Sequence, residues 1–346
     1  MKFVRQLEGR MKDRGTILIT GGAGYIGSHA VLAMRDAGFP IAVIDNLSTG
    51  RRELVPDDIP FIEGSIGDPI ALRRSIRLFR PHAVMHFAGT TIIPESIANP
   101  LKYYRENTTA SQTLISLCIE EGIRNFVFSS SAAVYGCPDT TPVPEDAATR
   151  PITPYGSSKL MTEWMLRDVA AVSDFRYATL RYFNVAGADP AGRSGHCGGM
   201  SNHLIKVACE AATGRRPDIP LYGEDYDTPD GTCIRDFMHV SDLASAHIKA
   251  LDHLVRHGTN LTLNCGYGHG VSVREIVEKF GELLGHPLAV RTTSRRPGDV
   301  PVVIADTRRI RTALDWSPQF DDLNTIIGTA LDWERRLAVA EREISA

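Results

Sequence analysis

Tyr155 and Lys159 lie four residues apart in the segment YGSSK, and their spacing is the most direct indication of chemistry in the chain. On a helix this spacing places both side chains on one face. A lysine cation beside a phenol stabilises the phenolate and lowers the tyrosine pKa from about 10 toward neutral pH. Ser131 follows a predicted strand, residues 125–130, and can bridge the phenol and a substrate hydroxyl. The three residues predict general-base catalysis, although a tyrosine and a lysine at this spacing also occur on ordinary helix surfaces.

Gly21, Gly24 and Gly27 follow a predicted strand, residues 16–20, and lead into a predicted helix, residues 25–37. Glycine permits the tight turn, lets the backbone approach a pyrophosphate and allows close helix packing. The helix N-terminus adds amide donors and the positive end of its dipole. A glycine triplet alone is weak evidence, but with the strand before it and the helix after it we predict a dinucleotide-binding loop.

Asp45 ends the second predicted strand, which covers residues 41–44. It follows the glycines by about twenty residues, the separation at which dinucleotide-binding proteins carry an acidic residue. A carboxylate there accepts hydrogen bonds from both ribose hydroxyls and repels a 2′-phosphate. An aspartate that begins a surface turn is the alternative. In this register Asp45 predicts NAD rather than NADP.

Strand-like runs alternate with longer helical patterns along the first half of the chain. The alternation predicts a Rossmann-type, doubly wound parallel sheet with helices on both faces. The expected strands are residues 16–20, 41–44, 83–87, 125–130 and 177–180, and the expected helices are residues 25–37, 101–121 and 155–171.

The character of the chain changes after residue 184, where a glycine-rich stretch runs to residue 199. We therefore expect an NAD-binding Rossmann domain over residues 15–184 and 236–265. A smaller α/β C-terminal domain is expected over residues 185–235 and 266–346. The charged residues 1–14 are expected to form a flexible extension.

The composition excludes several classes of protein. With 346 residues, a net charge of −3 and a pI near 6.4, the chain has no basic surplus to neutralise a nucleic-acid backbone. Its six cysteines are dispersed, without the spacing of metal ligands or of a disulfide framework, which is typical of a reducing compartment. No apolar run is long enough to span a membrane, and the first residues lack a signal-peptide pattern. We expect a cytoplasmic protein without a bound metal.

The motifs taken together resemble those of the extended short-chain dehydrogenase/reductase family and, more narrowly, of the UDP-glucose (UDP-galactose) 4-epimerases. The resemblance covers nearly the whole chain. Besides the glycine loop and the Tyr155/Lys159 pair, it is carried by residues 86–89 (HFAG), 129–136 (SSSAAVYG), 180–184 (LRYFN) and, most specifically, 222–240 (YGEDYDTPDGTCIRDFMHV).

This resemblance implies a redox-neutral isomerase of galactose and carbohydrate metabolism. Tyr155 would take the proton of the sugar 4-hydroxyl while carbon 4 gives a hydride to NAD. The resulting 4-keto sugar would turn about its pyrophosphate link, and the hydride would return to the opposite face. Lys159 would tune Tyr155 and hold the nicotinamide ribose, and Ser131 would position the 4-hydroxyl.

The resemblance also implies two sets of contact residues. For NAD they are Gly21, Gly24, Tyr25, Ile26, Gly27, Asp45, Asn46, Ser65, Ile66, Phe87, Ala88, Gly89, Asn107, Ser129, Tyr155, Lys159 and Tyr182. For the UDP-sugar they are Ser131, Tyr155, Asn184, Asn202, His203, Leu204, Tyr222, Arg235, Arg296, Asp299 and Val303. Among these, Asn184 and Arg235 would meet the diphosphate, Arg296 and Asp299 the phosphate and ribose, and Tyr222 the uracil.

The chain departs from the family pattern at four of its positions. Ser65 replaces an aspartate near the adenine, Thr91 replaces a lysine near the cofactor, and His203 replaces an asparagine that contacts substrate backbone. Val303 stands where a bulky aromatic residue would shut out a 2-acetamido group. We therefore expect a wider sugar pocket that also accepts N-acetylated sugars; the alternative is that Val303 merely continues a buried strand.

Other functions stay open at this point. A 4,6-dehydratase would carry Asp-Glu directly after the serine, where this chain has Ala132 and Ala133. An epimerase of another UDP-sugar (N-acetylhexosamine, pentose or uronate) or a decarboxylase of UDP-glucuronate would share the same motifs. A non-catalytic sensor of NAD or nucleotide sugar would usually have lost the base, whereas this chain keeps all three catalytic residues.

The resemblance further implies a homodimer in which the helices over residues 101–121 and 155–171 pair across a two-fold axis. The sequence supports this only in part, because core packing accounts for most of the apolar residues on these helices. They are Ile115, Leu117, Cys118, Met161, Trp164, Met165 and Leu166.

Overall fold

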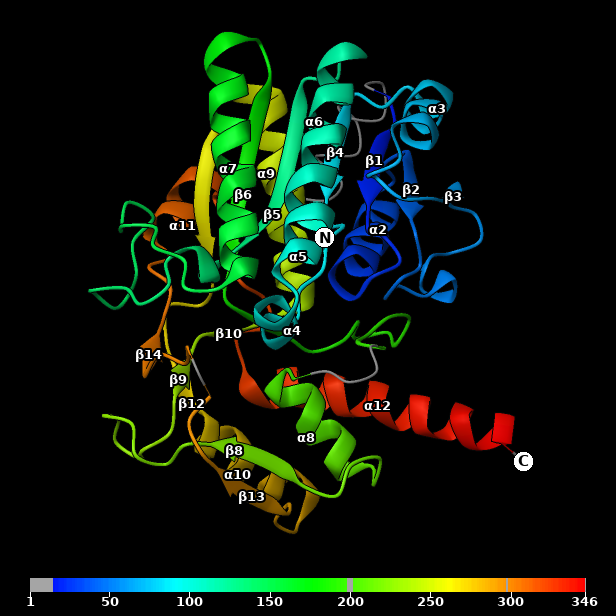
Figure 1. Ribbon diagram of the computed structural model, residues 1–346. Helices are drawn as coiled ribbons and strands as arrows, with labels where there is room; N and C mark the ends of the chain where they lie inside the picture. Colours follow the sequence, from blue (N-terminus) through cyan, green and yellow to red (C-terminus); the bar gives the residue numbers. More distant parts are fainter. Residues whose placement is uncertain (1–14, 198–201, 297, 346) are drawn as a thin grey trace.

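A seven-stranded, wholly parallel sheet forms the centre of the protein, in the order β3-β2-β1-β4-β5-β6-β11 (Figure 1). The computed structural model describes residues 15–197, 202–296 and 298–345, so the predicted extension, residues 1–14, lies outside the described residues. The predicted doubly wound Rossmann-type sheet is confirmed. Its strands are β1 (Ile17–Thr20), β2 (Ile41–Asp45), β3 (Phe61–Glu63), β4 (Ala83–His86), β5 (Asn125–Ser131), β6 (Arg176–Tyr182) and β11 (Leu261–Cys265).

Helices cover both faces of the sheet, and each face has its own apolar core. Alternate residues of β1 show the division, because Ile17 and Ile19 pack on one side and Leu18 on the other. The first side is covered by α2 (Tyr25–Asp36) and α9 (Val240–His257). The second is covered by α3 (Pro69–Phe79), α6 (Ala110–Glu120) and α7 (Pro154–Val172). Strands buried on both faces explain the nearly continuous apolar runs in the sequence.

Two predictions from the sequence were incomplete. The strand β3 and the helix α3 were not expected, since β3 has only three residues and carries no strong periodicity. The helix expected over residues 101–121 is interrupted. It consists of α5 (Pro100–Tyr103), the π-helix η3 (Tyr104–Thr109) and α6, and it is preceded by α4 (Ile93–Ala98). A π-helical turn inside a helix frequently marks a functional site.

Most of the remaining elements form a smaller lobe at the carboxyl edge of the sheet, in the lower half of Figure 1. A parallel pair, β7 with β10, lies between the sheet and this lobe. Two further small sheets have the orders β12-β9-β14 and β13-β8. The strands are β7 (Asn184–Ala186), β8 (Ile219–Tyr222), β9 (Ile234–Arg235), β10 (Phe237–His239), β12 (Val271–Ser272), β13 (Val290–Thr293) and β14 (Val302–Val303). The helices that follow residue 184, α9 apart, are α8 (Leu204–Ala212), α10 (Val273–Leu284), α11 (Arg308–Leu314) and α12 (Leu323–Ser345).

The chain passes between the two lobes more than once. Strand β11 returns to the main sheet beside β6, and α11 packs against β11 and α9. Helix α11 therefore lies against the larger lobe, although we expected its residues to belong to the smaller domain. The expected boundaries of the two domains stay a prediction.

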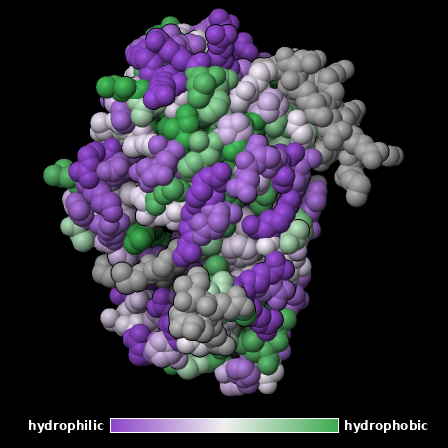
Figure 2. Space-filling model, turned by 90° about the vertical axis from the view of Figure 1, so that its right-hand side faces the viewer, coloured by the Kyte–Doolittle hydropathy of each residue, from purple (hydrophilic) through white to green (hydrophobic). Residues whose placement is uncertain are grey.

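The face shown in Figure 2 is largely hydrophilic, with a smaller hydrophobic group among the polar residues. Four of the apolar residues considered for dimerisation, Ile115, Leu117, Cys118 and Leu166, are buried in the core beneath α6 and α7. Trp164 stays 45% exposed on the outside of α7. Within the described part of the chain, no helix combines the length and apolar character needed to cross a membrane.

Candidate active site

The predicted catalytic residues meet where β5 ends and α7 begins. Thr153 caps α7 by accepting a hydrogen bond from the Gly156 amide (3.2 Å), and Pro154 occupies the first helical position. This start fixes the rotation of the helix, so that Tyr155 and Lys159 both face the strand and are buried. The structure thus brings together the residues that the sequence pattern paired.

Lys159 is held against the end of the strand. Its Nζ donates to the Ser129 carbonyl (3.0 Å) and lies 5.1 Å from the centre of the Phe128 ring. Burial lowers the pKa of Lys159 to about 8, and the negative charge of Glu163 opposes that shift. Because that pKa still lies above 7, most of the lysine is cationic at neutral pH.

Tyr155 shares a hydrogen bond with Ser131. Burial raises the pKa of the phenol, and the hydrogen bond with Ser131 lowers it. The Ser131 hydroxyl also accepts from the Ala133 amide (3.2 Å), which fixes its position at the start of η4 (Ala132–Val134). A nearby cation would bring the phenol toward a working pKa, and Lys159 lies one turn further along the same helix, α7.

The glycine loop packs closely against neighbouring backbone, which leaves no room for side chains. Gly21 has a φ of +71°, and a Cβ there would lie 2.5 Å from the amide nitrogen of Ala88. A Cβ on Gly27 would lie 2.1 Å from the carbonyl oxygen of Gly21. Two strand ends and the N-terminus of α2 thus approach one another closely, as a pyrophosphate-binding turn requires.

Asp45 lies at the carboxyl end of β2, facing this loop. Its two carboxylate oxygens accept hydrogen bonds from the amides of Ala23 (2.9 Å) and Leu47 (2.8 Å). Burial raises the pKa of Asp45, and these two amide donors lower it. Asn46 is exposed, with its side-chain oxygen accepting from the Ser48 amide (3.1 Å).

The side chains expected near the adenine follow β3. Ile66 is buried in the core with α3 and α6, and the Ser65 hydroxyl accepts from the Gly67 amide (3.1 Å). The serine that departs from the family pattern therefore stabilises its own turn.

The segment after β4 is held by Asn107 of the π-helix. Its Oδ1 accepts from the Thr90 amide (2.8 Å), and its Nδ2 donates to the Thr90 carbonyl and the Ser158 hydroxyl (3.0 Å each). A Cβ on Gly89 would lie 2.8 Å from this Oδ1. The extra residue of the π-turn points Asn107 at the loop between Phe87 and Thr90 and at α7, so both sides of the site are fixed by one amide.

Other residues predicted to contact the cofactor pack against one another around the same site. The Phe87 ring packs 4.7 Å from His247, whose Nε2 lies 3.3 Å from the Ser129 hydroxyl. That hydroxyl donates to Tyr182 (3.4 Å). The Tyr25 hydroxyl donates to the Gly187 carbonyl (2.7 Å), tying the glycine loop to the segment after β7, while Ile26 packs on the core.

These residues fit NAD. The glycine turn would hold the pyrophosphate, Asp45 the adenine ribose, and Lys159 the nicotinamide ribose. The fit rests on the close packing of the turn, which leaves no room for a side chain at Gly21, Gly27 or Gly89, and on the carboxylate at the end of β2.

In the smaller lobe, four predicted substrate residues lie close together. The guanidinium of Arg296 lies 4.0 Å from the centre of the Tyr222 ring, and the Arg235 Nη2 lies 3.8 Å from a carboxylate oxygen of Asp299. The Asp299 amide donates to the Arg296 carbonyl (3.1 Å). Two guanidinium groups beside one carboxylate and one aromatic ring can bind a diphosphate, a ribose and a base.

Val303 pairs with Arg235 across β14 and β9 and is half-buried. Asn184 begins β7 and is also half-buried. Asn202 and His203 directly precede α8, and Leu204 is its first residue. The role of this last group toward a sugar stays a prediction.

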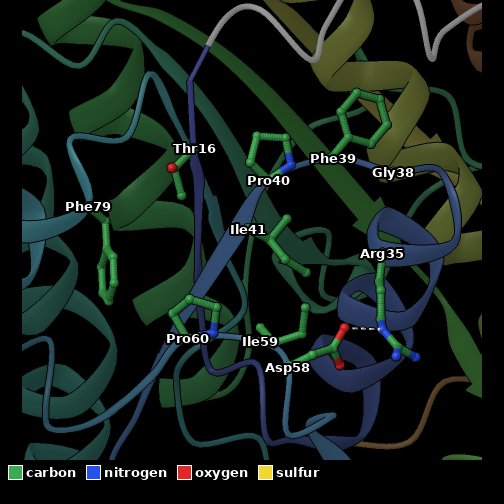
Figure 3. A pocket seen from close by; sticks show the side chains of 10 residues that line it. All are labelled: Thr16, Arg35, Gly38, Phe39, Pro40, Ile41, Asp58, Ile59, Pro60 and Phe79. Atoms are coloured by element: carbon green, nitrogen blue, oxygen red, sulfur yellow. Dashed lines mark hydrogen bonds and ion pairs between the residues drawn. The ribbon is translucent and has the colours of Figure 1, made fainter.

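A hollow of about 580 Å³ lies elsewhere, at the amino end of the sheet (Figure 3). Its lining includes Thr16 before β1, Ile41 at the start of β2, and the ion pair between Arg35 and Asp58 (2.9 Å). In open parallel sheets, ligands bind at the carboxyl ends of the strands, so this hollow is not the catalytic site.

Sequence reasoning missed several residues that shape the site. Tyr103 places its buried ring edge-on to Tyr155, with centres 6.4 Å apart, and its hydroxyl donates to the Ile92 carbonyl (2.6 Å). His86 bridges the hydroxyls of Thr20 and Ser111 (2.8 Å each). Of these residues, only Glu163 could have been found from the sequence. Residues 155, 159 and 163 are spaced four positions apart, which places them on a single helix face.

Comparison with known proteins agrees with this geometry. Residues 17–266 match the model of the NAD dependent epimerase/dehydratase family. The chain belongs to this family. It is 56% identical over 321 residues to UDP-glucose 4-epimerase of Azospirillum brasilense, covering 93% of this chain and 92% of the relative.

Solved structures give the same result. UDP-glucose 4-epimerase from Brucella ovis in complex with NAD superposes with a TM-score of 0.90 at 43% identity, covering 93% of this chain and 98% of that one. The UDP-Glc/GlcNAc 4-epimerase from Campylobacter jejuni superposes with a TM-score of 0.82 at 43% identity, covering 93% and 99%. The resemblance to UDP-glucose 4-epimerases, the assignment to the isomerases and the choice of NAD as cofactor are confirmed.

Proposed function

We propose that this protein interconverts UDP-glucose and UDP-galactose through a transient 4-keto sugar. The observation that carries the proposal is the buried set of Tyr155, Lys159 and Ser131. Lys159 lies beside Gly89, in the segment after β4 that also packs against the glycine loop. The similarity to the A. brasilense enzyme supports the substrate.

Each side chain has a defined task in this reaction. Tyr155 accepts the proton of the sugar 4-hydroxyl and later returns it, Ser131 holds that hydroxyl, and Lys159 stabilises the phenolate. When bound, NAD would supply the acceptor for the hydride of carbon 4 and the donor that returns it. The buried setting of the residues keeps water away from the keto sugar.

The smaller lobe would hold the nucleotide. Arg235 and Arg296 offer guanidinium groups to the diphosphate, Asp299 accepts from the ribose, and Tyr222 packs against the uracil. Asn184 would reach the diphosphate from β7. In this proposal residues 15–184 and 236–265 bind NAD, and residues 185–235 and 266–346 bind the UDP-sugar.

Location and assembly belong to the same proposal. All six cysteines are unpaired, which supports the reducing cytoplasm expected from the sequence. A homodimer through the outer faces of α6 and α7 is supported by the exposure of Trp164 and of Ile119, which is 44% exposed.

The deciding experiment is incubation of the purified protein with UDP-galactose without added NAD, followed by chromatography. We expect an equilibrium mixture with UDP-glucose, because the hydride returns in every cycle and bound NAD copurifies. A dehydrated or decarboxylated product would replace the proposal by one of the related activities, and strict dependence on added NAD would indicate a net dehydrogenase.

A second activity, on N-acetylated UDP-hexosamines, is supported by Val303. This half-buried side chain lies on β14 opposite Arg235, where the resemblance expects a bulky aromatic residue. A similar protein, from C. jejuni, is described as acting on both UDP-Glc and UDP-GlcNAc. We propose that the protein epimerises both classes of sugar.

A further inference from the structure

A buried ion pair lies one helical turn beyond Lys159. Glu163 of α7 and Arg181 of β6 form a two-point contact, Nε to Oε1 at 3.0 Å and Nη2 to Oε2 at 2.5 Å. Both side chains are only 8% exposed. A buried pair is costly to desolvate and adds little to stability relative to apolar side chains, so its presence calls for another explanation.

The carboxylate of this pair also holds the end of β5. The Ser130 hydroxyl donates to Glu163 Oε1 (2.5 Å). Ser130 lies between Ser129, whose carbonyl accepts from Lys159, and Ser131, which is hydrogen-bonded to Tyr155. Glu163 thus connects the helix that carries the base and the lysine to the strand that carries the serine.

Arg181 is anchored in turn from the other side. Its Nη1 donates to the Tyr135 hydroxyl (3.0 Å) and the Glu145 carbonyl (3.1 Å). The Tyr135 hydroxyl donates to Asn264 Oδ1 (2.7 Å), so the pair is fixed to the sheet at β11. The carboxylate therefore has one position rather than several.

We propose that Glu163 and Arg181 form a positioning pair that holds Tyr155, Lys159 and Ser131 in register, and that the Glu163 carboxylate also favours the charged form of Lys159. The proposal rests on the proposed function for its kinetic consequences. Neither residue touches the reacting atoms, so both act through the catalytic residues.

The charges around Lys159 agree with this role. The charged or titratable groups that interact electrostatically with Lys159 are Glu163 of α7, which is itself paired with Arg181 of β6, and His86 of β4. Burial, and then the charge of Lys159, lower the pKa of His86 to about 3, so this histidine is neutral. Burial lowers the pKa of Lys159 to about 8, and Glu163 opposes that shift. Without the carboxylate, Lys159 would lose its charge nearer to neutral pH.

The test is Glu163→Gln, which preserves the size of the side chain and removes its charge. We expect kcat on UDP-galactose at pH 7.5 to fall about tenfold while KM stays within about twofold, since the UDP contacts lie in the other lobe. The alkaline limb of the kcat–pH profile should move down by about one pH unit. A second readout is free of turnover. In NMR spectra of protein with isotope-labelled lysine, assigned with Lys159→Met, the pKa of Lys159 should fall by a similar amount.

The matched control is Glu334→Gln. Glu334 of α12 is 1% exposed and pairs with Lys206 (2.5 Å) and Arg215, far from the catalytic residues. This variant should lose stability but keep the pH profile and the pKa of Lys159. If Glu163→Gln behaves in the same way, the pair is merely structural and the proposal is overturned.

Ser130→Ala provides a second variant should Glu163→Gln fail to fold. This variant removes the hydrogen bond between β5 and Glu163 and leaves the charge of Glu163 in place. We therefore expect kcat to fall about fivefold, because the catalytic residues lose their register, while the alkaline limb of the kcat–pH profile stays unchanged. Wild-type kcat in this variant would overturn the positioning role. A wild-type protein that does not convert UDP-galactose would instead contradict the proposed function, while the NMR titration would still test the effect of Glu163 on the charge of Lys159.

Discussion

At the scale of single residues, the proposed chemistry depends on a phenol that burial makes less acidic and on the cation of Lys159, which we expect to make that phenol more acidic. Burial raises the pKa of Tyr155, and its hydrogen bond with Ser131 works in the opposite direction. Lys159 stays largely cationic at neutral pH even though burial lowers its pKa to about 8. To accept the proton of the sugar 4-hydroxyl, Tyr155 has to be the phenolate, and a cation close to the phenol favours that form.

Tyr155→Phe should retain the fold and NAD but lose about 10² to 10⁴ in kcat, the usual loss when a general base is removed. The ring packs in the same place against Tyr103, so stability should change little. Steady-state turnover of UDP-galactose measures the loss, and the NAD content of the purified variant is the control. Near-normal turnover would remove Tyr155 from the role of base.

Val303→Tyr should abolish activity on N-acetylated UDP-hexosamines and spare activity on UDP-glucose. A ring at this half-buried position would occupy the space that an acetamido group needs, and such misfits cost about 1 to 3 kcal/mol for each methylene-sized overlap. Parallel assays of both sugars on wild type and variant provide the comparison. A wild type that turns over UDP-galactose but not the N-acetylated sugars would contradict the wide pocket.

At the scale of elements, two close approaches shape the cofactor side of the site. The glycine loop brings β1 against the end of β4, and the π-helix η3 turns Asn107 toward the same place. Both approaches depend on backbone geometry. Glycines provide it in the loop, and the π-turn provides it for the amide of Asn107.

Gly27→Ala should reduce the NAD that copurifies and destabilise the protein. The new Cβ would lie 2.1 Å from the Gly21 carbonyl oxygen, which forces α2 away from the turn. Absorbance of the released nucleotide and a thermal melt measure the two effects. Gly328→Ala, in α12 with no atom within 4 Å of the added Cβ, is the matched control and should be neutral or slightly stabilising. Full NAD content in Gly27→Ala would show that the close packing is dispensable.

At the scale of the whole molecule, the buried histidines tie stability to pH. Burial is the largest of the effects that lower the pKa of His29, His239 and His247 to about 4 and the pKa of His86 to about 3. Unfolded histidines titrate near 6.5, so below that pH the unfolded chain binds more protons than the folded one. The stabilisation is complete above about pH 6.5 and is lost progressively toward pH 4.

The midpoint of urea unfolding should therefore fall steadily between pH 7 and pH 5. One pKa unit corresponds to about 1.4 kcal/mol, so a few such groups weigh heavily against a total stability of about 5–15 kcal/mol. Asp236 and Asp242, whose pKa burial raises, act in the opposite direction toward the acidic end. His247→Gln should flatten the slope. A midpoint that stays constant from pH 7 to pH 5 would refute this link.

Assembly is also decided at this scale. Light scattering at micromolar concentration should give the mass of a dimer, and Trp164→Glu should shift it toward monomer, because an exposed ring on α7 would be replaced by a charge. Arg167→Glu, a change on the same helix at an already polar position, is the control. A wild type that is wholly monomeric would exclude the proposed dimer.

The sequence by itself determined the features that depend on neighbours a few residues apart. The turn of Gly21, Gly24 and Gly27, the placement of Asp45, and the helix-face pairing of Tyr155 with Lys159 follow from local periodicity and backbone freedom. The parallel sheet also follows, because strands that alternate with helices have few other arrangements. The short β3, the helix α3 and the π-helix gave no comparable local signal.

Only the tertiary structure decided which distant residues meet. Arg235 and Asp299 are 64 positions apart, Glu163 and Arg181 lie on different elements, and Tyr135 reaches Asn264 across 129 positions. Such contacts are fixed by how the chain crosses between lobes and by which face of each element is buried. Local propensity carries no information on either, because it extends over only a few residues, whereas these contacts become favourable only when the whole core has assembled.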